Sequence, residues 1–245
     1  MRAHRAGCWA ATLPGMRIPA DEDVRALHEK YAPAPAAFDL VYTHCLIVCG
    51  IAEELSARSA NRPGSGPGGG PEAGLDIGLF RAGSLLHDIG VYRLYDEAGR
   101  LDHANYIRHG LLGYEILRAE GLPEAVCRFA ARHTGMGLTR EDVLRQRLPL
   151  PPCDYVAETG EEALVMYADK FHSKTTPPVF LTASAYAASV RRFGAAKAAA
   201  FEAMRQRFGE PDLAPFSSTY GYRVLAAAPD RWRRALPRAR PWTPR

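Results

Sequence analysis

The sequence predicts an all-α fold. Apolar residues recur at helical spacing along most of the chain, and no stretch alternates convincingly at period two. Proline, aspartate, threonine and glycine stand at the boundaries of these segments as helix start and stop signals. At 245 residues, one domain with extensions is favoured over two full domains.

Two helices are predicted before residue 60. Pro19 and Asp21 start the first, which Pro33 ends. The second runs from about Phe38 to Arg58 and carries a broad apolar face. Residues 61–74 are mostly Gly and Pro, which predicts a flexible surface loop.

The helices after this loop are bounded by turn residues, N-caps and acidic first turns. In chain order we expect a helix over 76–88 ending at Ile89-Gly90, one over 103–120 closed by Gly121, one from Pro123 to His133, a short one capped by Thr139, and one begun at Thr159 that carries Asp169 and ends before Pro177-Pro178. Helices over 180–193 and 195–208 follow. The expected organisation is a flexible N-terminal extension (1–20), a helical domain (21–180) and a helical C-terminal extension with a basic Pro/Arg tail (181–245).

Composition and charge point to a globular protein with a small-molecule partner. The formal net charge is only +4, and the basic tail has no alternation of aromatic and basic residues, so nucleic-acid binding is not expected. No apolar run of 18 residues is evident, so no membrane span is expected. Five cysteines without CxxC spacing indicate neither a disulfide framework nor a zinc knuckle and favour a reduced, cytoplasmic setting. The oligomeric state stays open.

Six residues in the helical segments have the side chains of a metal site: His44, His87, Asp88, His109, His133 and Asp169. Imidazole and carboxylate are the usual ligands of Zn, Fe, Mn or Co in reactive sites. His87-Asp88 and Asp169 each end an apolar helical stretch, where an uncompensated charge is unfavourable by several kcal/mol on an order-of-magnitude scale. Six ligands exceed the need of one tetrahedral metal and suit two metals that share the central aspartate.

A histidine in a helix is more often a surface or hydrogen-bonded core residue than a ligand. We expect that ordinary role for His4, His28 and His103, and leave His172 open.

Leu85-Leu86-His87-Asp88-Ile89-Gly90 resembles the HDIG signature of the HD-domain superfamily of metal-dependent phosphohydrolases. His44 upstream and Ala168-Asp169-Lys170 downstream match its companion motifs, and His109 and His133 match the two additional histidines of binuclear members. The resemblance covers about residues 21–180 and is greatest to a branch of small hydrolases. It implies an HD-domain helical bundle followed by the C-terminal extension. The diglycine-tyrosine-proline motif of cyclic-di-GMP phosphodiesterases is missing, which disfavours that substrate.

The resemblance implies a chemistry and a role for each residue. His44, His87, Asp88 and Asp169 would hold one metal, and His109, His133 and Asp88 a second. The metals would be divalent Fe, Mn, Co, Ni or Zn. A metal-activated hydroxide would attack a small phosphate ester, such as a nucleotide or a related phosphomonoester or phosphodiester. Cationic side chains would bind the phosphate oxygens. The candidates are Lys170, Lys174, Arg108 and Arg132, and Arg81 lies upstream of the His87-Asp88 pair.

Two other functions remain open. The same ligand set is similar to that of mixed-valent di-iron oxygenases of this superfamily, typified by myo-inositol oxygenase, which cleave a C–C or C–P bond. A binding or regulatory protein with a vestigial site is disfavoured, because no ligand is lost from the set.

Overall fold

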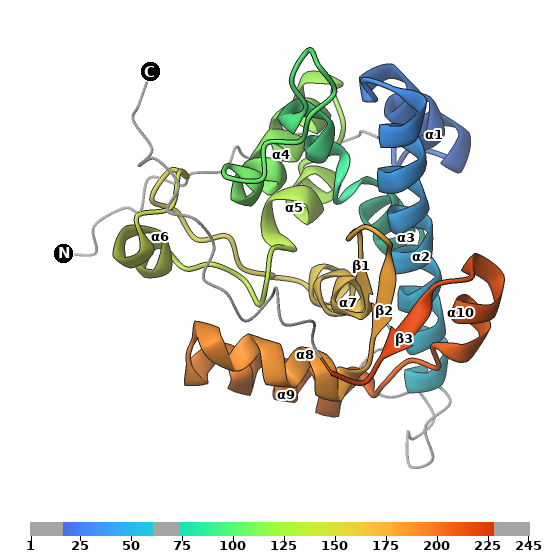
Figure 1. Ribbon diagram of the computed structural model, residues 1–245, viewed down its shortest axis with the longest axis vertical. Coiled ribbons are helices and arrows are strands. Elements are labelled where there is room, and N and C mark those ends of the chain that lie inside the picture. Colours follow the sequence, from blue (N-terminus) through green and yellow to red (C-terminus); the bar gives the residue numbers. More distant parts are fainter. Residues whose placement is uncertain (1–16, 61–73, 228–245) are drawn as a thin grey trace.

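The computed structural model describes residues 17–60 and 74–227, and Figure 1 shows their arrangement. The predicted N-terminal extension up to residue 16, the loop over 61–73 and the basic tail from residue 228 lie outside the described residues. The described part is mostly helical, as the sequence predicts.

The elements follow one another in short succession, with 3-10 helices (η) next to several α-helices. In chain order they are α1 Asp21–Tyr31, α2 Pro35–Ala60, α3 Ile77–Leu86, η1 Ile89–Leu94, η2 Tyr106–Arg108, α4 His109–Ala119, α5 Glu124–Arg132, α6 Arg140–Gln146, α7 Gly160–Ala168, η3 Asp169–Phe171, β1 His172–Ser173, β2 Val179–Leu181, α8 Ala183–Val190, η4 Arg191–Phe193, α9 Ala195–Phe208, α10 Ala214–Tyr220 and β3 Arg223–Leu225.

The helix boundaries largely follow the predicted signals. The Asp76 side chain accepts a hydrogen bond from the amide of Leu79 at 2.9 Å and caps α3. Thr139 and Thr159 cap α6 and α7 in the same way. Gly121 has φ of 77°, the left-handed conformation expected after the end of α4. The helix predicted over 103–120 is shorter than expected, because residues 106–108 form η2 and α4 starts at His109.

The long helix α2 is the centre of the packing. By length and composition alone, its segment Pro35–Ser59 could cross a membrane, which the sequence analysis did not anticipate; the expectation of no membrane span stays a prediction. Of that window, 56% is buried inside the protein, and α2 contacts both α3 and α7. Two apolar clusters meet along it: one includes Val41 and Cys45, and the other includes Ile47 and Ile51. His44 is buried on the same helix.

A small sheet was not predicted. β1 pairs antiparallel with β2, and β2 pairs parallel with β3, so the C-terminal segment joins the helical core (Figure 1). The helix predicted over 180–193 starts later than expected, because residues 179–181 form β2 and are buried throughout. The helix starts only after Thr182, whose side chain accepts from the amide of Ala185 at 3.2 Å. Strands of two or three residues are too short to give a period-two pattern.

Two further features differ from the expectations. The helix α10 was not predicted. Cys45, Cys49 and Cys127 are buried free thiols. Cys153 is disulfide-bonded, so the expectation that the cysteines are reduced is wrong for Cys153. The cytoplasmic setting stays a prediction.

Candidate metal centre

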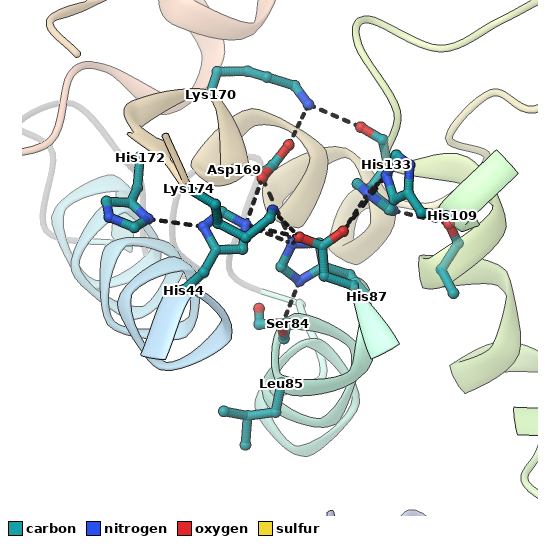
Figure 2. A network of polar contacts seen from close by, with 12 residues as sticks. His44, Ser84, Leu85, His87, His109, His133, Asp169, Lys170, His172 and Lys174 are labelled. Atoms are coloured by element: carbon teal, nitrogen blue, oxygen red, sulfur yellow. Dashed lines mark hydrogen bonds and ion pairs between the residues drawn. The ribbon is translucent and has the colours of Figure 1, made fainter. Parts of the chain in front are cut away.

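All six predicted ligands converge on one buried site (Figure 2). His44 comes from the middle of α2, whereas the other five stand at the ends of helices. The helix ends explain how adjacent His87 and Asp88 share a site: α3 stops at Leu86, and Asp88 leaves helical geometry with φ of −106° and ψ of 7°. In a continuous α-helix, the side chains of adjacent residues would point about 100° apart around the helix axis.

Glycines let the helices approach closely enough to bring these ends together. A Cβ on Gly90 would lie 2.0 Å from the carbonyl oxygen of His109 and 2.2 Å from the amide of Gly113. A Cβ on Gly110 would lie 2.7 Å from the carbonyl oxygen of Ala130. The glycine of the HDIG sequence is therefore required because the backbone of α4 packs directly on it.

The two carboxylate oxygens of Asp88 face two different groups of histidines. Oδ2 lies 3.2 Å from Nε2 of His44 and 3.6 Å from Nε2 of His87. Oδ1 lies 3.5 Å from Nε2 of His109 and 3.5 Å from Nε2 of His133. His44, His87 and Asp88 form one potential metal group, and Asp88, His109 and His133 form another. This arrangement suits a bridging carboxylate.

Asp169 belongs to the first group. Its Oδ1 lies 3.0 Å from Nε2 of His44 and 3.6 Å from Nε2 of His87. The first group thus has two imidazoles and two carboxylates, and the second has two imidazoles and the shared carboxylate.

Three of the ligand histidines are held in one tautomer by backbone carbonyls. Nδ1 of His87 donates to the carbonyl of Ser84 at 2.6 Å, and Nδ1 of His109 donates to that of Tyr106 at 2.6 Å. Nδ1 of His133 lies 2.9 Å from the carbonyl oxygen of Ala130. With the proton on Nδ1, each Nε2 has a free lone pair directed into the site, which is the arrangement found in metal-ligating histidines.

These lone pairs need a cation between them. Nε2 of His109 and Nε2 of His133 lie 2.9 Å apart, so two acceptors face each other in the protein interior. Oδ1 of Asp88, beside them, is buried without a hydrogen-bond partner among the described residues. A cation would satisfy all three atoms, and imidazole with carboxylate is a suitable donor set for a transition metal. The residues present therefore fit the implied metals.

The charge states of Asp88 and His109 agree with metal binding. Burial alone would raise the pKa of Asp88, but the Lys174 ammonium outweighs it and holds that pKa well below its ordinary value. Burial lowers the pKa of His109 to about 3. Asp88 is therefore an anion and His109 a neutral base near neutral pH, which are the forms that bind metals.

The predicted phosphate-binding cations lie in different surroundings. The Lys174 ammonium forms an ion pair with Oδ2 of Asp88. The buried Lys170 donates to Oδ2 of Asp169 at 2.6 Å and to the carbonyl of His133 at 2.9 Å, so it connects the two ligand groups (Figure 2). Both lysines therefore contact candidate metal ligands.

The arginines are farther from that role. Arg132 is 3% exposed and lies 2.7 Å from Glu158 and 3.3 Å from Glu162. Arg81 pairs with Asp21 and Glu53 on the outer side of α3. Arg108 instead lines a surface cleft of about 470 Å³ together with Arg93 and Asn105.

The other histidines divide as expected, with one addition. His28 is buried and lies 2.7 Å from the carbonyl oxygen of Leu85 and 2.8 Å from the hydroxyl of Tyr92. His103 is exposed, and His4 lies outside the described residues. His172, left open by the sequence, contacts the ligand His44. The sequence analysis did not identify Tyr106 as a neighbour of the site; the centroid of its ring lies 4.7 Å from that of His109.

Proteins of known sequence resemble this part of the chain. An uncharacterized protein of Methanocaldococcus jannaschii is 40% identical over 129 residues, which cover 53% of this chain and 64% of that protein. The tRNA (cytidine(56)-2'-O)-methyltransferase of Picrophilus torridus is 41% identical over 95 residues, covering 39% of this chain and 24% of the methyltransferase. The matches thus span less than two thirds of either relative.

Among solved structures, the HD domain of the L. monocytogenes phosphodiesterase PgpH aligns with 84% of this chain and 90% of its own, at 17% identity and a TM-score of 0.40. The model of the HD domain family matches residues 41–174, a segment that begins just before the first ligand and ends just after the last. This match covers more than half of the sequence and includes all six converging side chains, so the chain belongs to the HD domain family.

Proposed function

We propose that this protein is a metal-dependent phosphohydrolase that acts on a small phosphate ester, a nucleotide or a related phosphomonoester or phosphodiester. The observation that carries the proposal is the division of the ligands around Asp88, whose two oxygens face two separate groups of histidines. Membership of the HD domain family supports the same conclusion.

The six predicted ligands would form two metal positions. His44, His87, Asp88 and Asp169 would hold one ion, and Asp88, His109 and His133 the other, each ion being divalent Fe, Mn, Co, Ni or Zn. Bound metals supply Lewis acidity, which lowers the pKa of a water and neutralises charge on phosphoryl oxygens. Asp88 and Asp169 would orient the ions, and the Lys174 ammonium would donate a hydrogen bond to a phosphate oxygen of the substrate.

The proposal is tested by phosphate release from a panel of phosphomonoesters and phosphodiesters. The purified protein is stripped with a chelator and reloaded with Mn, Co, Fe, Ni or Zn. We expect hydrolysis of at least one ester class that depends on added metal and stops when the chelator returns. Absence of hydrolysis with every metal and every ester would contradict the proposal.

The two lysines are expected to respond differently to substitution. Lys174→Met should reduce kcat about tenfold or more with metal content unchanged, since a charge-assisted contact contributes about 1.5–3 kcal/mol. Lys170→Met should lower metal content instead, because its ammonium holds the Asp169 carboxylate and the His133 carbonyl.

Steady-state kinetics and elemental analysis on the same samples separate these outcomes. Unchanged turnover in Lys174→Met would remove its proposed contact with phosphate and make Arg108, beside the cleft, the next candidate.

A further inference from the structure

His44 differs from the other ligand histidines in what holds its Nδ1. His87, His109 and His133 each direct Nδ1 to a backbone carbonyl at a helix end. His44 lies inside α2, where the backbone carbonyls of the preceding turn are used by the helix itself. Its Nδ1 instead lies 2.8 Å from Nδ1 of His172 (Figure 2). The partner is thus a second imidazole.

This contact requires one particular arrangement of protons when a cation is bound. If Nε2 of His44 binds the cation, the proton of His44 is on Nδ1 and is donated to His172. Nδ1 of His172 must then be an acceptor, and the proton of His172 must be on its Nε2.

The surroundings of His172 agree with this arrangement. Its Nε2 is buried and has no hydrogen-bond partner among the described residues. An unsatisfied buried donor is unfavourable by about 1–3 kcal/mol, and such groups in native proteins call for an explanation. The bond to His44 supplies one: it uses the lone pair of Nδ1, so the proton of His172 is left on Nε2.

The C-terminal segment holds the His172 ring in place. His172 pairs with Phe180 across β1 and β2, and their ring centroids lie 5.1 Å apart. The ring of Tyr222, just before β3, stacks on His172 with centroids 5.7 Å apart and an angle of 21° between the planes. His172 also stacks on His44, at 5.1 Å and 28°. The extension beyond residue 180 therefore reaches the surroundings of a metal ligand.

We propose that His172 is a positioning residue of the metal centre: its Nδ1 accepts the Nδ1–H of His44 and holds His44 in the tautomer and orientation that bind a cation through Nε2. The proposal rests on the metal centre of the proposed function and does not depend on the phosphate substrate.

The test compares two amides at position 172. In His172→Asn the amide oxygen can stand near the former Nδ1 and accept from His44, whereas in His172→Gln the longer side chain places its amide near the former Nε2. Loss of a partner of this kind weakens metal binding by about 10–100-fold. We therefore expect His172→Gln to bind Co²⁺ about 10–100-fold more weakly and His172→Asn to stay within about threefold of the wild type.

His103→Gln is the matched control, because it makes the same substitution at an exposed histidine outside the ligand set; its Co²⁺ affinity should stay unchanged. Circular dichroism and thermal melts establish that each variant is folded. Nitrogen-15 NMR of the proteins saturated with diamagnetic Zn²⁺ should show the His44 Nδ1–H hydrogen-bonded and protected from exchange in the wild type and His172→Asn more than in His172→Gln. Equal Co²⁺ affinity in the Asn and Gln variants, or an equal loss in His103→Gln, would overturn the proposal. Neither readout uses a phosphate ester, so failure of hydrolysis leaves this test intact.

Discussion

Asp88→Asn is expected to empty both metal positions and to lower phosphate-ester hydrolysis by at least about 1000-fold. Asparagine keeps the size of the side chain but loses the charge that faces both histidine groups. Metal ions contribute several kcal/mol to catalysis, and about 4 kcal/mol corresponds to about 1000-fold in rate. Elemental analysis and phosphate release on the same sample measure both effects.

The Lys174 ammonium complicates that variant, because it pairs with Asp88. Removing the partner of a fully buried charge is unfavourable by about 3–5 kcal/mol, and the side chain of Lys174 is 15% exposed, so the penalty here is smaller. The double variant Asp88→Asn/Lys174→Met removes both charges and separates loss of metal from loss of fold. His103→Ala, an exposed position, should leave metal content unchanged. Full metal occupancy in the folded double variant would contradict the bridging role of Asp88.

His133→Ala is expected to keep one metal and lose the other. His133 contacts His109 and Oδ1 of Asp88, whereas Asp169 contacts only the first group of histidines. Activity should fall about 100-fold or more, since loss of one cation removes several kcal/mol of charge stabilisation. Metal counting after gel filtration, with circular dichroism on the same sample, gives the occupancy of the folded protein. Loss of both metals, or loss of the fold, would mean that the two groups are not independent.

Many helix boundaries could be predicted because the side chains that cap a helix lie within a few residues of the amides they bind. Asp76, Thr139 and Thr159 cap helices through bonds to amides three residues away. The three-stranded sheet could not be predicted in this way, because Val179–Leu181 pairs with residues 223–225, far along the chain. Its buried apolar run is equally compatible with a helix.

The sequence motifs were enough to select six side chains that the structure brings together, but not the contacts of the residues around them. The roles of Lys170 and His172 depend on partners 37 and 128 positions away, which no local pattern reveals. Their neighbours in sequence gave only a weak hint, since both follow Asp169 within three residues. Gly90 was recognised as part of a motif, while its physical reason, the direct contact with α4, required the structure.

In our proposal the six predicted ligands serve hydrolysis and not the oxygen chemistry that di-iron oxygenases carry out with a similar ligand set. The most direct measurement follows phosphate release and O₂ consumption together, on protein loaded with iron and partly oxidised, with phosphate esters, phosphonates and polyols as substrates. Because metals of the divalent series compete for such a site, the metal recovered on purification is a poor guide to the native one. We predict phosphate release from an ester at the same rate with and without O₂, and no substrate-dependent O₂ uptake. Robust O₂ uptake coupled to loss of a phosphonate or polyol would contradict the assignment as a phosphohydrolase.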